Sequence, residues 1–256
     1  MLQYDEQRNS LWVGTNGDGL NRIDFNSNTI STYRPDADDP SKLPHPRIRS
    51  IYLDKDNQLW VGSGGGLSLW NEANNTFKTI KSSANKSELS DEDVRAIFPQ
   101  DENLLWVATG NGLNLFDTST FEVQQRLSEK NGLANSTTYS LLSDNEGLLW
   151  ISTANGLSRF NPSTLEFTNY LVDHGLQGNE FNFNAWHKDK DGLLYFGGVN
   201  GINIINPQKL LQKNTLAKPV FTSVHAYAKS GEELPLARML SGDKMYGPPR
   251  CCKNNF

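Results

Sequence analysis

The 256-residue sequence has little cysteine, little methionine and no long apolar run. Its two cysteines, Cys251 and Cys252, are adjacent near the C-terminus, which excludes a disulfide framework and a spaced set of cysteine metal ligands. The four histidines form none of the short spacings that bind zinc, so we expect no metal and no cofactor. No window approaches the ~20 apolar residues of a membrane helix, and the first residues lack the basic and apolar regions of an export signal.

Positive charge is also scarce, because 24 Lys and Arg stand against 29 Asp and Glu, a formal net charge of −5. Proteins that bind the phosphate backbone need clustered basic residues, so we expect no nucleic-acid partner. The apolar share of 36% is low, whereas 21 glycines and 11 prolines provide many turns. This composition favours short strands joined by turns over a helical bundle.

An internal repeat is the strongest feature of the sequence. A Leu-aromatic pair recurs at intervals of 44 to 48 residues and is followed by a small residue, a Gly-Leu or Gly-Ile pair and an Asp or Asn. The aromatic positions are Trp12, Trp60, Trp106, Trp150 and Tyr195. The repeated glycines are Gly19, Gly66, Gly112, Gly156 and Gly201. Five such units predict five copies of one supersecondary structure.

The unit around Trp60 predicts four strands, at residues 48–54, 59–63, 67–71 and 76–81, separated by turns rich in Asp, Asn and Gly. Four-stranded antiparallel units of this length are the blades of a β-propeller. We therefore predict an all-β fold, with about five blades over residues 1–208. The repeated aromatic residue is expected to fill the space between blades, and the repeated glycine to form a tight turn. The glycine-rich residues 62–66 open no helix and lack the lysine of a P-loop, so a nucleotide loop is rejected.

The repeat resembles a known family. Residues 144–161, DNEGLLWISTANGLSRFN, are similar almost throughout to the two-component regulator propeller repeat, which occurs in extracytoplasmic sensor regions of hybrid histidine kinases and related diguanylate cyclases. The motif GL-x-x-NEFN, followed by YFGG-x-NGI, resembles the closing blade of that family's second propeller. Residues 219–224 resemble the first strand of its immunoglobulin-like domain.

The resemblance implies a domain plan. After the blades of residues 1–208 we expect a linker at 209–218, the start of an immunoglobulin-like domain at 219–235 and a divergent, poorly packed tail at 236–256. It also implies a fragment of a longer receptor, periplasmic if part of that receptor, and allows a homodimer formed through the full-length protein. The kinase or cyclase output would lie elsewhere, so no enzymatic activity is expected of this chain.

Ligand binding is expected where the first strand of each blade lines the central channel. Two residues before the repeated apolar position of that strand stand Arg49, Arg95, Tyr139 and Asn184. The loops that enter these strands add His45, Arg47, Asp91, Glu92, Asp93, Asn135, Asn179 and Glu180. These polar groups could hold a small polar ligand or an oligosaccharide, with Arg binding a carboxylate. An equally weighted alternative is that Arg49 and Arg95 pair with acidic neighbours inside the channel.

The favoured function is therefore a ligand-binding sensor propeller. A protein-interaction or oligomerisation scaffold is the alternative, and it predicts an apolar patch on one face of the molecule. A propeller lyase or glycosidase ranks third, because it would need His45, His174 and Glu180 to meet in space. No catalytic residue is predicted. The acidic residues between the first two strands of each unit are expected to be turn formers.

Overall fold

The computed structural model describes residues 1–211, 226–227 and 233–234. The chain divides into two compact units, residues 1–212 and 213–256. In the second unit the described residues form a short antiparallel pair, β20 (Ala226–Tyr227) with β21 (Glu233–Leu234). The strand expected at 219–224 and the tail expected at 236–256 lie outside the described residues, as does most of the linker at 209–218.

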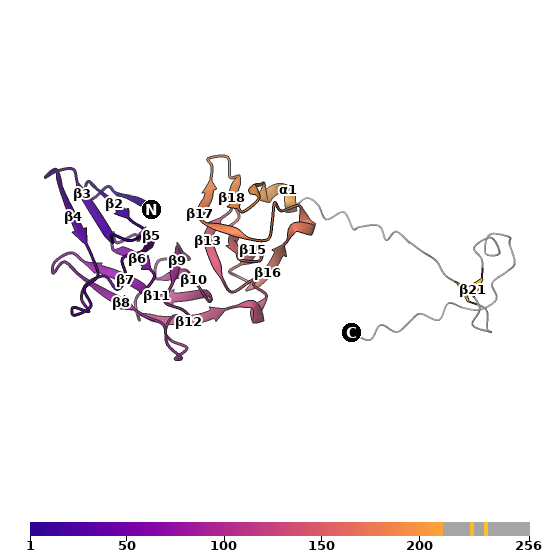
Figure 1. Cartoon of the computed structure of the whole chain (residues 1–256), viewed down its shortest axis with the longest axis horizontal. Coiled ribbons are helices and arrows are strands. Elements are labelled where there is room, and N and C mark those ends of the chain that lie inside the picture. Colours follow the sequence, from indigo (N-terminus) through magenta and orange to yellow (C-terminus); the bar gives the residue numbers. More distant parts are fainter. Residues whose placement is uncertain (212–225, 228–232, 235–256) are drawn as a thin grey trace. The chain divides into compact units, whose positions relative to one another are not determined.

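The first unit contains five antiparallel sheets, each built from consecutive strands (Figure 1). The first blade consists of β1 (Leu2–Asp5), β2 (Ser10–Gly14), β3 (Leu20–Asp24) and β4 (Thr29–Tyr33). The second consists of β5 (Ile48–Leu53), β6 (Leu59–Ser63), β7 (Gly66–Asn71) and β8 (Thr76–Ile80). The third consists of β9 (Val94–Pro99), β10 (Leu104–Thr109), β11 (Gly112–Asp117) and β12 (Glu122–Leu127). The fourth consists of β13 (Thr138–Ser143), β14 (Leu149–Thr153), β15 (Gly156–Asn161) and β16 (Glu166–Tyr170). The predicted all-β propeller fold with five blades is confirmed.

The fifth blade differs from the expected pattern, because its sheet has three strands among the described residues. These are β17 (Phe181–Lys188), β18 (Leu194–Gly198) and β19 (Gly201–Ile205). A short helix, α1 (Pro207–Leu211), follows directly. Asn206 caps this helix by accepting a hydrogen bond from the Lys209 N–H, at 3.2 Å, and Pro207 occupies the first helical position, where no N–H is needed. The Asn-Pro pair thus starts a helix at the point where the other blades turn into their fourth strand.

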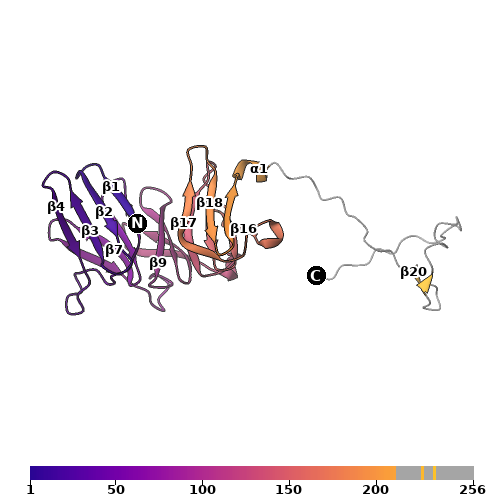
Figure 2. The ribbon, with the colours of Figure 1, turned by 45° about the horizontal axis from the view of Figure 1, so that its top comes forward.

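The five blades follow one another along an arc, with their first strands β1, β5, β9, β13 and β17 side by side in succession. Figures 1 and 2 show the first blade at one end of this arc and the β17 blade at the other. The first strands therefore line one central channel, as expected for a propeller. Among the described residues no helix is long and apolar enough to cross a membrane.

The hydrophobic core lies between neighbouring sheets. Trp12, Trp60, Trp106 and Trp150 are at most 1% exposed, and each belongs to a cluster that joins two successive blades. For example, Trp12 meets the edge of Trp70 in the second blade, with 4.9 Å between ring centroids. Because apolar burial occurs between blades and hardly within one, each blade depends on its neighbours for stability.

Each buried aromatic residue is also held by a polar group from the turn that precedes it. The indole N–H of Trp60 donates to Asp54 Oδ2 at 2.9 Å, and that of Trp150 donates to Asp144 Oδ2 at 2.9 Å. The other oxygen of each carboxylate accepts two backbone N–H groups of its own turn. The corresponding acceptors in the first, third and fifth blades are Asp5, Gln100 and Asp189. Asp54, Asp144 and Asp189 therefore shape the turn and hold the aromatic side chain at the same time, whereas in the third blade Gln100 holds Trp106 and Asp101 holds the turn.

The five repeated glycines all have positive φ, from +78° at Gly19 to +134° at Gly201. Each lies in the tight turn between the second and third strands of its blade or begins the third strand. An L-residue is disfavoured in this region of backbone conformation. Glycine is therefore needed at these positions for the backbone conformation of the turn, and a phosphate-binding role is not required to explain it.

Candidate ligand-binding site in the central channel

Two arginines from neighbouring first strands share one carboxylate in the channel. Arg49 of β5 binds Asp93 through Nε at 2.6 Å and Nη2 at 3.2 Å. Arg95 of β9 binds the same carboxylate through Nε at 2.9 Å. The pairing of both arginines with an acidic neighbour, one of the two interpretations of the sequence, is thus present in the structure. Two positive groups against one negative group leave this cluster with a formal charge of +1.

Two aromatic rings complete the cluster. The guanidinium carbon of Arg49 lies 4.3 Å from the ring centroid of Phe183, and that of Arg95 lies 4.8 Å from the same ring. Tyr139 of β13 packs edge-on against Phe183 with 4.7 Å between centroids, and its ring lies 5.3 Å from the guanidinium of Arg95. Cations over aromatic faces are attracted by the ring quadrupole. Residues from the second, third, fourth and fifth blades therefore meet at one place in the channel.

Phe183 is the residue of this cluster that the sequence did not predict. The expected position was its neighbour Asn184, chosen by counting back from Trp186 in regular β alternation. The pairing of β17 with β18 is irregular between Phe181 and Trp186, and Asn184 has a φ of +53°. A bulge of this kind changes which side chain points to each face. The neighbouring Phe183 therefore contacts the arginines.

A hollow of about 390 Å³ opens beside the arginines. It is lined by Met1, Gly14, Thr15, Asn16, Arg47, Ile48, Arg49, Phe183 and Asn184. Three predicted binding residues, Arg47, Arg49 and Asn184, therefore line one cavity. Arg95 and Tyr139 contact Phe183 but do not line the cavity. Burial lowers the pKa of Arg49; Asp93 raises it, and the positive charges of Arg95 and Arg47 lower it further. A guanidinium retains its charge at neutral pH under such shifts, so the hollow presents a fixed cation.

The remaining predicted residues are placed away from this hollow. His45 Nδ1 accepts the Arg47 backbone N–H at 3.1 Å, and Asn179 Oδ1 accepts that of Val172 at 2.9 Å in the short helix η2 (Val172–His174). His174 accepts the Leu171 N–H at 3.1 Å, and Glu180 is exposed. These polar atoms serve their own loops. Among the described residues no hydrogen bond joins His45, His174 and Glu180, the three residues that the lyase or glycosidase hypothesis requires to meet.

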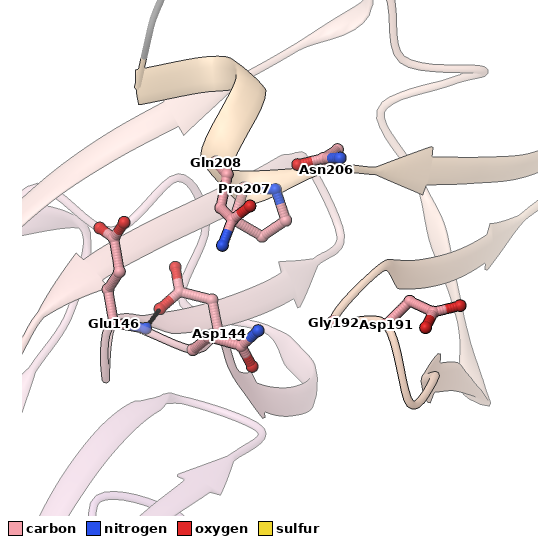
Figure 3. Close-up of a pocket in the computed structure, with 8 residues that line it drawn as sticks. Asp144, Glu146, Asp191, Gly192, Asn206, Pro207 and Gln208 are labelled. Carbon is pink, nitrogen blue, oxygen red and sulfur yellow. Dashed lines mark hydrogen bonds between the residues drawn. The ribbon is translucent and has the colours of Figure 1, made fainter.

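A second hollow lies at the turns of the fourth and fifth blades. Figure 3 shows its lining residues, among them Asp144, Glu146, Asp191, Gly192, Asn206, Pro207 and Gln208. Asp144 accepts the Glu146 backbone N–H at 2.9 Å, and its other oxygen holds Trp150. The hollow measures only about 10 Å³, roughly the space that one water occupies. Asp144 thus stabilises a turn, and the channel with its larger hollow remains the better candidate site.

The sequence pattern described as two component regulator propeller matches residues 42–65 and 132–155. Each stretch runs from the loop before a first strand to the strand that carries the buried tryptophan. Two of the five repeats of the chain therefore match the two-component regulator propeller family. No curated protein matches it.

Solved propeller structures are similar to this chain over most of its length. The chain is 28% identical to the extracellular domain of BT4673 from B. thetaiotaomicron, described as a hybrid two component system, with a TM-score of 0.69 over 81% of this chain and 29% of that one. The corresponding domain of BT3049 is 21% identical, with a TM-score of 0.65 over 81% and 27%. Virginiamycin B lyase from Staphylococcus aureus, 15% identical with a TM-score of 0.59 over 81% and 66%, shares the fold alone. The chain spans less than a third of the length of the two receptor domains.

Proposed function

We propose that this chain is a ligand-binding part of the extracytoplasmic sensor region of a bacterial signal-transduction receptor, and that the signal output resides elsewhere in the receptor. The propeller repeats and the similarity to extracellular domains of hybrid two-component systems support this assignment. The proposal puts the chain in the periplasm. It assigns no chemical step to the chain itself, because the described polar groups serve turns and the channel cluster.

The observation that carries the proposal is the cluster of Arg49, Arg95 and Phe183 beside the hollow. One carboxylate cannot satisfy the donors of two guanidinium groups, each of which has five N–H groups. A carboxylate on a ligand can therefore be bound by a guanidinium in a charge-assisted hydrogen bond. The side chains of Asn16 and Asn184 around the hollow supply donors and acceptors for hydroxyl groups, whereas the Thr15 hydroxyl is bonded within its own turn.

This chemistry best fits a small polar ligand, and specifically a saccharide that carries a carboxylate. Sugar hydroxyls can form hydrogen bonds with the amide side chains around the hollow, and the apolar face of a sugar ring can pack on Phe183. An acidic substituent can pair with the cation of Arg49. A neutral sugar would leave the positive charge of the cluster unused. The proposal therefore distinguishes acidic from neutral ligands.

Titration calorimetry with a panel of oligosaccharides, each acidic member paired with its carboxyl-reduced form, tests the proposal. We expect binding of an acidic member and a loss of about tenfold or more in affinity with Arg49→Ala, the size of one charge-assisted hydrogen bond. Arg159→Ala is the matched control, because Arg159 lies on β15, the third strand of the fourth blade, and does not line the hollow. Equal affinity for acidic and reduced forms, or equal losses in the two variants, would contradict the proposal.

The scaffold function that the sequence left as an alternative is favoured by a different observation. Large apolar side chains are exposed on the outer faces of the first and fifth blades, among them Ile30 at 69% and Ile204 at 60%. Exposed apolar sheet faces of this kind mark interaction surfaces. The two functions use different parts of the molecule and are compatible.

A further inference from the structure

The channel cluster contains one carboxylate for two guanidinium groups. Asp93 Oδ1 accepts a hydrogen bond from Arg49 Nε at 2.6 Å, and Asp93 Oδ2 accepts one from Arg49 Nη2 at 3.2 Å and another from Arg95 Nε at 2.9 Å. The pairing with Arg49 is bidentate, which is the geometry in which a guanidinium binds a free carboxylate. Asp93 therefore occupies on Arg49 a position that the carboxylate of a ligand would otherwise take.

The two arginines are held differently. Arg49 lines the hollow, and its side chain is 14% exposed, so a ligand in the hollow could reach its guanidinium. Arg95 does not line the hollow, and its Nη1 also donates to the Thr138 carbonyl oxygen at 2.9 Å. Arg95 is thus fixed by two acceptors, Asp93 and Thr138, whereas the described residues give Arg49 an ion pair with Asp93 alone. Of the two guanidinium groups, that of Arg49 can more easily change its partner.

Asp93 can leave Arg49 without becoming an unpaired charge. Its backbone is fixed directly before β9, because its N–H donates to Asp91 Oδ1 at 2.9 Å and its carbonyl oxygen accepts the Gly110 N–H at 3.0 Å. Its side chain is partly exposed and already bonded to Arg95 through Oδ2. A carboxylate that left Arg49 would therefore keep a cationic partner and avoid the large cost of a buried charge without one.

We propose that the carboxylate of an acidic ligand displaces Asp93 from Arg49, and that Asp93 thereby sets the affinity of the channel site for acidic ligands. In the free protein two guanidinium groups share one carboxylate. In the complex each has its own, since Arg49 binds the carboxylate of the ligand and Arg95 keeps that of Asp93. The inference rests on the proposed ligand-binding function and names the residue that regulates access to Arg49.

The exchange also connects binding to the arrangement of the blades. Arg49 belongs to β5 of the second blade, and Asp93 stands at the start of β9 in the third blade, so their ion pair joins two blades across the channel. A ligand that takes the place of Asp93 removes this contact between the two blades. Binding at the channel site would therefore change how strongly the second and third blades are coupled.

Calorimetry of Asp93→Asn tests the proposal. The probes are the acidic oligosaccharide of the panel above that binds the unsubstituted chain most tightly and its carboxyl-reduced form. The substitution keeps the size of the side chain but removes the negative charge that competes for Arg49. We expect the affinity for the acidic probe to rise by about threefold to tenfold and the affinity for the reduced probe to stay unchanged. Circular dichroism checks that the strand content is unaltered.

Two controls separate displacement from a general effect of charge. Glu92→Gln removes the same charge from the exposed neighbour of Asp93 and should leave the affinity for the acidic probe nearly unchanged, because Asp93 is the residue bonded to both arginines. Asp93→Asn combined with Arg49→Ala should show no gain over Arg49→Ala alone, because no guanidinium is then released at the hollow.

The outcomes distinguish this inference from the function on which it rests. If no acidic oligosaccharide binds the unsubstituted chain, the proposed function fails and the displacement fails with it. If the acidic probe binds but Asp93→Asn leaves its affinity unchanged or lowers it, the displacement alone is overturned, and a lower affinity would show that Asp93 holds Arg49 in place for the ligand. An equal gain with Glu92→Gln, or a gain that persists without Arg49, would also overturn it.

Discussion

The fourth and fifth blades are built on the same repeat but differ in how many neighbours they have. In the fourth blade Trp150, Leu157 and Phe160 are completely buried, with blades on both sides. In the fifth blade Tyr195 is only partly buried, and Ile202 and Ile204 are open to solvent. The comparison shows that the repeat specifies two contact surfaces per blade and that most burial comes from the neighbours.

The largest difference between the two blades should appear when the repeated aromatic residue is truncated. Trp150→Ala should cost about 3–5 kcal/mol of unfolding free energy, because it leaves a cavity between two blades. Tyr195→Ala should cost less than half of that, since the ring is partly exposed before the change. Urea denaturation followed by tryptophan fluorescence and circular dichroism measures both values. Equal losses would mean that the Tyr195 ring is covered in solution.

A smaller effect should follow from removing the carboxylate that holds the aromatic residue. Asp144→Ala deletes the acceptor of the Trp150 N–H and of two backbone N–H groups, and should cost about 1–3 kcal/mol. Asp189→Ala, at the same position of the fifth blade, should cost less, because water replaces the lost bonds at its exposed turn. Asp144→Asn is the matched control; its single carbonyl oxygen can accept either from Trp150 or from the two backbone N–H groups, so the loss should be about half that of Asp144→Ala. If Asn and Ala were equally harmful, the charge of Asp144 would be the source of its effect.

The smallest effect should come from the turn glycines. Gly112 has a φ of +100°, and a Cβ there would clash with the Leu127 carbonyl oxygen of the neighbouring strand. Gly201 has a φ of +134°, but a Cβ there meets nothing within 4 Å. Gly112→Ala should therefore cost about 2 kcal/mol, and Gly201→Ala about 1 kcal/mol from backbone strain alone. Thermal unfolding of the two variants checks the order, which would be reversed if another chain packed on Gly201.

The repeat made most of the fold predictable, because its period, its strand patterns and its turn glycines are all local signals. The tryptophan positions followed for the same reason. The bond from the Trp150 N–H to Asp144 was missed although an Asp stands six residues before the aromatic residue in three of the five units, since turn formation already explained an Asp at that place. The helix after Ile205 could not be predicted from Asn206-Pro207, because the same pair at Asn161-Pro162 leads into the fourth strand of the fourth blade.

The channel site was predictable only in part. Arg49, Arg95 and Tyr139 follow from counting along the first strands, and the structure brings them to one place. Phe183 could not be predicted because a bulge in β17 changes the alternation, and nothing in Glu-Phe-Asn-Phe-Asn, residues 180–184, shows where the extra residue lies. Their role in binding a ligand stays a prediction.

The strictly consecutive strand order has a consequence for how the chain is made. Every strand of a blade pairs with a strand beside it in the sequence, so no strand waits for a partner that has not yet been synthesised. During translation a blade can complete its hydrogen-bonded ladders once its fourth strand has left the ribosome. It becomes protease-resistant only when the following blade covers its tryptophan face. We therefore expect limited proteolysis of stalled nascent chains to give protection that rises in steps of one repeat and lags one blade behind synthesis.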